Sequence, residues 1–300
     1  MSDRRPTITI TDKAHGLPFS KGLLAQSLTA TGLAPSRAYE IAALIQDDLR
    51  EREELSLTTE RLREVTRDYV KRLAGDEFAR RYLKLRDVSR LDRPLIVLIG
   101  GTTGVGKSTI ATEVAHRLGI TRITSTDSIR QVMRGIFSKD LMPAIHDSAF
   151  SAWQGLRVPV PQGADPVIVG FREQTAAVTS GVKAIIERAV LEGTSMVIEG
   201  IHLVPGYLDL GQFSAARVVH IVIGVDDEQS HLSHFYIREV QTEGTRPLER
   251  YRTGFKSIRT LGVYIEEMAR EHDVPLIYSH QLDRTVADVL ECVVTKAIDE

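Results

Sequence analysis

The stretch LIVLIGGTTGVGKST, residues 95–109, decides the fold of this chain. Residues 95–99 form an unbroken apolar run rich in β-branched side chains, which indicates a strand buried on both faces of a parallel sheet. Residues 101–108 then fit the phosphate-loop pattern G-x-x-x-x-G-K-[ST], and the apolar spacing of residues 109–118 predicts a helix. Strand, glycine-rich loop and helix in this order predict an α/β fold that binds a nucleotide.

The residue types of this loop suit a triphosphate. Glycines let the chain curl closely around an anion, and the positive end of the following helix dipole faces the same anion. Lys107 can reach the β- and γ-phosphates, and the Ser108 hydroxyl can bind Mg²⁺. We therefore expect ATP and Mg²⁺, with the nucleotide held by Gly101, Thr102, Thr103, Gly104, Val105, Gly106, Lys107, Ser108 and Thr109. The alternative is a glycine-rich turn without a ligand.

The composition of the chain limits its number of domains, its partners and its cellular compartment. The chain has 300 residues, of which 42% are hydrophobic and 26% charged, enough for two modest domains. A net charge of −2 argues against a nucleic-acid or membrane partner, and no apolar run is long enough for a signal peptide or a membrane span. The single cysteine, Cys292, cannot form an internal disulfide, so we expect a cytoplasmic protein. A homo-oligomer remains an open alternative.

Two further predicted strands, residues 121–124 and 195–198, each lead to an acid. In a doubly wound sheet, ligands gather outside the carboxyl ends of the strands, so Asp127 and Glu199 should face the phosphates. Asp127 could orient or deprotonate a substrate hydroxyl or hold Mg²⁺ through water, and Glu199 is the expected metal-binding acid. The alternative for Asp127 is a simple cap of a helix that begins at Ser128.

Side chains around Asp127 are candidates for binding an acidic substrate. Residues 137–171 read as a long irregular insertion of the kind that carries function, and residues 175–192 as the amphipathic helix after it. The alternative is a structural or surface role for each candidate, and for Arg130 and Arg134 a solvated side chain. The substrate candidates are Asp127, Arg130, Arg134, His146, Arg157, Arg172, Gln174 and His202, with Trp153 as a wall.

Residues 238–259 are predicted to form a basic lid of two helices. Six basic side chains outnumber three glutamates there, and a closing cationic lid stabilises the charge of a transferring phosphoryl group. We expect Arg246, Arg250 and Arg252 to act on the nucleotide; the alternative is an exposed, salt-bridged helix. The pair His231 and His234 has a spacing that could suggest zinc, but no third ligand lies nearby in the sequence.

The rest of the chain completes two domains. Predicted strands at 217–225 and 274–278, and a last helix at 286–298, give a five-stranded parallel sheet of the P-loop NTPase type, with a domain from 91 to 300. The polar segment 85–94 marks the boundary. Residues 1–90 predict a short ribbon near 7–19 and helices that begin near Ser20, Pro35 and Thr58.

The first domain resembles an ATP-cone, a small nucleotide-sensing module. The resemblance covers residues 7–85 and rests on PFSKGLLAQSLTATGL, the helix with Ala42 and Ala43, and the helix start LTTERL. It implies regulatory nucleotide binding, and a structural or oligomerising role is an equal alternative.

As a whole, the chain resembles the 2-phosphoglycerate kinase family. The residues that carry this resemblance are LPFSKGLLAQSL, IGGTTGVGKSTIA, TSTDSIRQVMR, PVIVGFREQ and MVIEGIHLVPGYL. It implies transfer of the ATP γ-phosphate to the 3-hydroxyl of 2-phosphoglycerate, with Lys107, Asp127, Glu199 and Arg250 as catalytic residues. Two alternatives stay open: a kinase for another small phosphorylated or acidic hydroxyl compound, and an ATP-sensing regulator without kinase activity.

Overall fold

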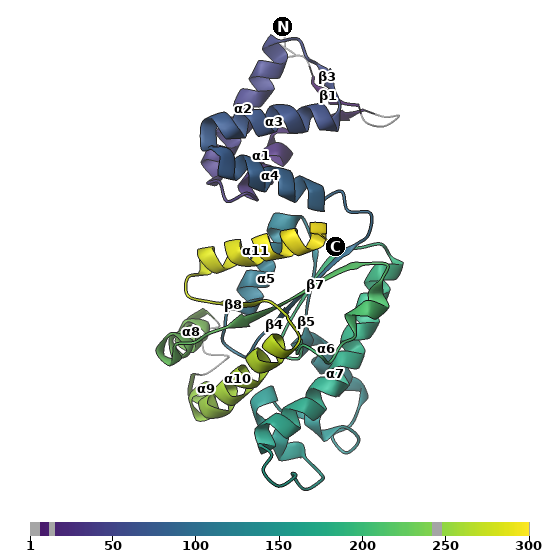
Figure 1. Ribbon diagram of the computed structural model, residues 1–300, viewed down its shortest axis with the longest axis vertical. Coiled ribbons are helices and arrows are strands. Elements are labelled where there is room, and N and C mark those ends of the chain that lie inside the picture. Colours follow the sequence, from purple (N-terminus) through teal and green to yellow (C-terminus); the bar gives the residue numbers. More distant parts are fainter. Residues whose placement is uncertain (1–6, 12–15, 242–247, 300) are drawn as a thin grey trace. The chain divides into compact units, whose positions relative to one another are not determined.

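The computed structural model of the chain (Figure 1) describes residues 7–11, 16–241 and 248–299. The described chain divides into two compact units. One runs up to Arg90 and includes residues 117–119, and the other holds residues 91–116 and the chain from Ile120 onward. Each unit has a hydrophobic core of its own.

The first unit combines a small sheet with helices. Strand β1 is central, antiparallel to β2 and parallel to β3. Ser20 and Thr58 cap the first and third helices through their side-chain oxygens, as the sequence predicts. The elements are β1 (Thr9–Ile10), β2 (Leu17–Pro18), α1 (Lys21–Thr29), α2 (Pro35–Glu51), β3 (Ser56–Leu57), α3 (Thr59–Ala74) and α4 (Asp76–Val88). Helix α4 was not predicted from the sequence. Gly75, at φ 103°, ends α3, and α4 begins at the next residue.

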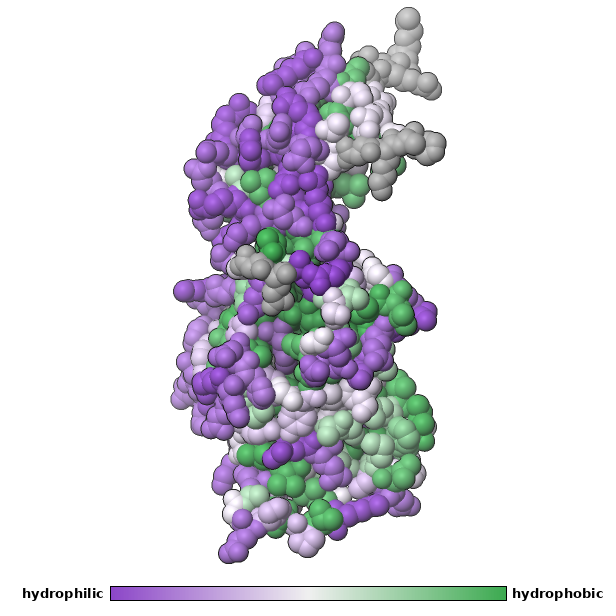
Figure 2. All heavy atoms as spheres, turned by 45° about the vertical axis from the view of Figure 1, so that its right-hand side comes forward, coloured by the Kyte–Doolittle hydropathy of each residue, from purple (hydrophilic) through white to green (hydrophobic). Residues whose placement is uncertain are grey.

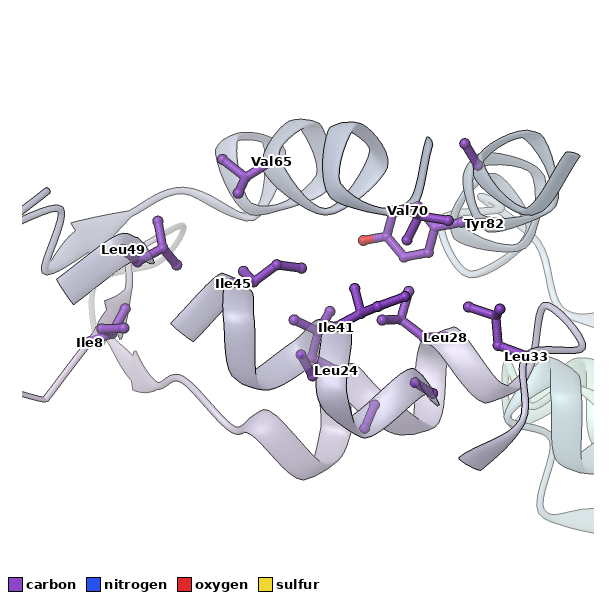
Figure 3. Close-up of a cluster of buried hydrophobic side chains, with 14 of the residues drawn as sticks. Ile8, Leu24, Leu28, Leu33, Ile41, Ile45, Leu49, Val65, Val70 and Tyr82 are labelled. Carbon is purple, nitrogen blue, oxygen red and sulfur yellow. The ribbon is translucent and has the colours of Figure 1, made fainter. Parts of the chain in front are cut away.

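The core of this unit lies between its helices (Figure 3). Ile41, Ile45 and Leu49 recur at helical spacing along α2 and are fully buried. They meet Leu24 and Leu28 of α1 in the same cluster. Burial of this apolar surface holds the first unit together.

The second unit is built on five parallel strands, which confirms the predicted α/β fold. The strands are β4 (Leu95–Gly100), β5 (Arg122–Ser125), β6 (Met196–Glu199), β7 (Arg217–Gly224) and β8 (Leu276–Tyr278). Their order is β5-β6-β4-β7-β8, and each neighbouring pair is parallel. Strand β4 lies at the centre and every one of its residues is buried, as its apolar run predicts.

Helices cover both faces of this sheet. Figure 1 shows α5 and α11 on one side, and α7 and α10 on the other. Ile129 of α6 and Val178 of α7 share a buried cluster with Leu98, and Leu261 of α10 packs near Val222. The helices are α5 (Lys107–Leu118), α6 (Thr126–Ile136), α7 (Pro166–Leu191), α8 (Glu228–Gln241), α9 (Leu248–Thr253), α10 (Phe255–Glu271) and α11 (Leu282–Asp299), with short 3₁₀ helices at Pro143–His146, Ala149–Gly155 and Leu210–Phe213.

Two sequence predictions about this unit are wrong in detail. Helix α7 begins at Pro166 rather than near residue 175, because Asp165 accepts a hydrogen bond from the Val167 N–H and proline suits the first helical turn. Helix α6 begins at Thr126, capped by the Ser125 side chain, so Asp127 is not the cap of this helix. The irregular insertion is therefore shorter than expected, and Asp127 lies in the first turn of α6.

Among the described residues, no helix has both the length and the apolar content that a membrane crossing requires. The visible face of the second unit carries several hydrophobic patches among hydrophilic residues (Figure 2). Exposed apolar side chains of the second unit include Val132, Ile136, Leu141 and Val158. Larger exposed patches often mark interaction sites. The open alternative of a homo-oligomer stays a prediction.

Candidate active site

The phosphate loop connects β4 to α5 at the centre of the sheet. Gly101, Gly104 and Gly106 have φ angles of 134°, 91° and 86°, a region that side-chain-bearing residues rarely adopt. A Cβ on Gly104 would also lie 2.5 Å from a ring carbon of Phe235. Helix α5 begins at Lys107, so its unpaired N–H groups and positive dipole end lie directly after the loop.

Lys107 is buried at the base of the loop, with 8% of its surface exposed. Its Nζ donates a hydrogen bond to the Thr102 carbonyl at 2.7 Å. Burial lowers the pKa of Lys107, while the negative charges of Glu199 and Asp127 raise it. The lysine therefore lies within electrostatic reach of both predicted acids, as expected for one site.

A hydroxyl and a carboxylate meet beside this lysine. Ser108 Oγ donates to Glu199 Oε1 at 2.9 Å. The register explains the contact, because Ile99, which precedes the loop, pairs with Glu199 at the end of β6. Hard oxygen ligands of this kind suit Mg²⁺, so Ser108 and Glu199 form an appropriate donor set for that ion.

Asp127 occupies the next position along the same sheet edge. Ser125, at the end of β5, pairs with Glu199, and Asp127 follows two residues later. Its side chain is 69% exposed and forms an ion pair with Arg130 at 3.3 Å. The structure therefore brings the ends of three adjacent strands to one edge: β4 leads to the loop, β6 ends at Glu199 and β5 leads to Asp127.

The predicted substrate-binding arginines lie in different settings. Arg130 is mostly buried, and its Nη1 donates to the carbonyls of Ile145 and Asp147 at 2.9 and 3.0 Å. Arg134 donates to Gln131, Arg157 to carbonyls of the insertion that include Asp140, and Arg172 to the Tyr207 hydroxyl. Among the described contacts, only Arg130 of these four arginines binds Asp127 directly.

His202 is part of a buried hydrogen-bond network. Its Nδ1 lies 2.9 Å from Thr126 Oγ1 and its Nε2 lies 2.8 Å from Gln174 Oε1. The Gln174 amide nitrogen donates to the carbonyls of Ala144 and Asp147, so its oxygen faces the imidazole. Burial lowers the pKa of His202 to about 3, hence the ring is neutral and accepts from Thr126. Both ring nitrogens are engaged within the protein. His146 likewise bonds through Nε2 to the Phe137 carbonyl.

The predicted lid is only partly described. Arg246 lies outside the described residues, and Arg250 lies on α9 with a side chain that is also outside them. Arg252 is exposed and pairs with Glu249 at 3.6 Å. Arg259 on α10 donates to the carbonyls of Val225 and Asp226 at 2.6 and 3.0 Å. The lid therefore stays a prediction.

The structure adds a contact that the sequence analysis missed. His231 Nε2 lies 2.7 Å from the Thr103 carbonyl oxygen, and His234 Nδ1 lies 2.9 Å from that of Gly104. Burial lowers the pKa of His231 to about 4. The i, i+3 spacing of these histidines is the one sequence feature that points to them. It places both side chains on one face of a helix, and that face contacts the loop.

A parallel five-stranded sheet with a phosphate loop, a buried loop lysine and a serine–glutamate pair defines the class: a P-loop nucleotide-binding protein. The chain is 42% identical to the 2-phosphoglycerate kinase of Methanothermobacter thermautotrophicus over 94% of this chain and 92% of that protein. It is 40% identical to the 2-phosphoglycerate kinase of Pyrococcus furiosus over 94% of this chain and 91% of that protein. The chain belongs to the 2-phosphoglycerate kinase family.

Other comparisons add little. No protein-family model matches the chain. A crystal structure of a gluconokinase from Sinorhizobium meliloti covers 69% of this chain and 95% of its own, at 15% identity and a TM-score of 0.42.

Proposed function

We propose that this chain transfers the γ-phosphoryl group of ATP to the 3-hydroxyl of 2-phosphoglycerate, giving ADP and 2,3-bisphosphoglycerate. Relatives named 2-phosphoglycerate kinase that match nearly the whole chain support this acceptor. The observation that carries the proposal is the contact between Ser108 and Glu199 beside the buried Lys107. The reducing cytoplasm is the expected setting, because the chain has one cysteine.

On the donor side, Lys107 and the loop amides bind the β- and γ-phosphates. Ser108 and Glu199 would hold Mg²⁺, and Asp127 would hold it through water, because oxygen ligands are the ones that this ion prefers. When bound, Mg²⁺ supplies charge neutralisation at the phosphate oxygens. Arg246, Arg250 and Arg252 are proposed to add positive charge from the lid, with Arg250 close to the transferred group.

On the acceptor side, Asp127 is the proposed base. Its exposed carboxylate takes the proton of the 3-hydroxyl, the hydroxyl oxygen bonds to the γ-phosphorus, and the bond from that phosphorus to the bridging oxygen breaks to release ADP. The ion pair with Arg130 holds the Asp127 carboxylate in position for this role. Arg130, Arg134, Arg157 and Arg172 are the proposed contacts for the carboxylate and phosphate of the substrate. His202, the remaining candidate, is proposed to act indirectly, because its hydrogen bonds to Thr126 and Gln174 use both ring nitrogens.

We also propose that residues 1–90 form an ATP-cone-like domain and residues 91–300 the kinase domain. The support for this is the mostly helical character of the first unit, with its own small sheet and core. A regulatory domain of this kind would bind a nucleotide, whereas a structural or oligomerising domain would not.

The test is ADP release by the full chain with ATP and Mg²⁺, supplied separately with 2-phosphoglycerate, 3-phosphoglycerate, glycerate or no acceptor. We expect ADP release only with 2-phosphoglycerate at low acceptor concentration, with 2,3-bisphosphoglycerate identified by mass spectrometry. A clear preference for another acid would replace the acceptor, and tight ATP binding without acceptor-dependent ADP release would favour a regulator.

A further inference from the structure

His231 and His234 lie on one face of α8 and contact two successive carbonyls of the phosphate loop. The acceptors are the backbone oxygens of Thr103 and Gly104, at 2.7 and 2.9 Å. A carbonyl oxygen can only accept, so the ring nitrogens must donate. His231 therefore carries its hydrogen on Nε2, and His234 carries one on Nδ1.

These two hydrogen bonds fix the direction of two amides. A trans peptide unit is planar, and its C=O and N–H point in opposite directions. With the Thr103 carbonyl directed to His231, the N–H of Gly104 points away from α8. The same holds for the Gly104 carbonyl and the N–H of Val105. Both are amides of the loop segment that cradles phosphate oxygens in this motif.

The packing keeps the histidine side of the loop in place. His231 is fully buried and stacks on Phe235, with ring centroids 5.3 Å apart and an interplanar angle of 24°. Phe235 in turn stacks on Tyr251 of α9, with centroids 4.6 Å apart. Gly104 fits under the Phe235 ring, where a Cβ would collide. The rings therefore cannot turn away from the carbonyls without disturbing this aromatic cluster.

His231 acts as a neutral donor. Its Nδ1 is buried and has no hydrogen-bond partner within the described structure, so a second proton there would be left unpaired. Burial lowers its pKa to about 4, against the hydrogen bond to Thr103, which raises it; the positive charges of Arg259 and Lys107 act in the same direction as burial. The donor at Nε2 is therefore present at neutral pH without a charge on the ring.

We propose that His231 and His234 are positioning residues that hold the 103–104 and 104–105 peptide units with their amides turned toward the β-phosphate of the nucleotide. The proposal rests on the nucleotide-binding part of the proposed function and not on the acceptor. A preorganised amide binds an anion without the cost of reorienting the peptide. Loss of either histidine should therefore weaken binding of nucleotides that have a β-phosphate.

Matched substitutions test this. His231→Gln places an amide N–H near the position of Nε2, whereas His231→Met removes the donor. His234→Asn places one near Nδ1, whereas His234→Leu removes it. Dissociation constants for ADP and AMP are measured by calorimetry on the full chain without acceptor. We expect His231→Met and His234→Leu each to weaken ADP binding about tenfold. Binding of AMP should stay within about twofold, and the Gln and Asn variants should recover most of the loss.

Three results would overturn the proposal: unchanged ADP binding by folded Met and Leu variants, equal weakening of ADP and AMP, or no recovery with Gln and Asn. Circular dichroism reports folding. If His231→Met does not fold, the two variants of the half-buried His234 decide the test. Because no acceptor is present, the outcome is independent of the substrate. If the wild-type protein does not phosphorylate 2-phosphoglycerate but the variants show the expected ADP affinities, the proposed acceptor is refuted and the inference about the histidines stands.

Discussion

Lys107 combines a buried ammonium group with two carboxylates close enough to act on its charge. Its hydrogen bond to Thr102 satisfies only one of three donors, and the other donors can serve a phosphate. Among the described residues no salt bridge involves this ammonium, so the fold holds it at the base of the loop.

Replacing Lys107 by Ala should reduce turnover about 10³-fold or more, because the developing charge on the phosphoryl oxygens loses a fixed cation. Folding should persist, since the change also removes a buried charge. Steady-state ADP production and thermal melting measure the two effects. Lys183→Ala, an exposed lysine of α7 paired with Glu187, is the control and should keep wild-type turnover. Near-normal turnover by Lys107→Ala would contradict the proposed role.

Glu199→Gln should raise the Mg²⁺ concentration for half-maximal activity about tenfold, because a neutral amide is a weaker ligand for a hard cation. The contact with Ser108 could persist through the amide oxygen, so the fold should tolerate the change. Activity measured over a range of Mg²⁺ concentrations gives the shift. Glu187→Gln, on the exposed face of α7, is the matched control. An unchanged Mg²⁺ requirement would remove Glu199 from the metal site.

Some residues of the site can be predicted from the sequence and others cannot, for a physical reason. Lys107 and Ser108 lie inside one contiguous motif, and Glu199 ends an apolar strand, so local patterns suffice. The histidine contacts join residues 128 and 130 positions apart, which no local pattern reports. The same holds for the contact of Gln174 with His202, 28 positions away.

Among the elements, α7 shows where local reasoning is insufficient. Its first turns contain Val167, Val169 and Gly170, residues that do not favour a helix on their own. Tertiary packing compensates: Phe171 is fully buried, and Gly170 lies so close to the Trp153 backbone that a Cβ would collide with it. Asp165 directly before Pro166 is a helix-start pattern in the sequence, but the apolar run after it hides the helical spacing.

Asp165→Ala should lower the free energy of unfolding of the second unit by about 1 kcal/mol, because the Val167 N–H loses its side-chain acceptor. Urea unfolding followed by the fluorescence of Trp153, the single tryptophan, measures this change. Asp165→Asn keeps an acceptor oxygen and serves as the control. If Ala and Asn variants unfold at the same urea concentration as wild type, the cap does not stabilise α7.

At the scale of the whole molecule, three buried histidines make stability depend on pH. Burial lowers the pKa values of His202 to about 3 and of His220 and His231 to about 4. In the unfolded chain, histidine titrates near 6.5, so the unfolded state binds more protons as the pH falls below that value. Stability is therefore complete above about pH 6.5 and falls as the pH decreases toward 4.

We expect each of these histidines to cost about 2 kcal/mol of unfolding free energy between pH 7 and pH 5. Urea unfolding at pH 7, 6 and 5, again through Trp153, measures the total. His220→Gln keeps a donor for the Leu203 carbonyl without titrating, so it should remove about one third of the loss. A pH dependence identical to wild type would show that His220 is not held neutral.

The backbone of the insertion between α6 and α7 is anchored by two side chains from the helices that flank it. Arg130 and Gln174 hold it through the main-chain oxygens of Ala144, Ile145 and Asp147, which every amino acid possesses. Exposed positions of this segment, such as Leu141 and Val158, can therefore change while this anchoring survives, whereas the fully buried Ile145 and Ala152 are constrained by the core.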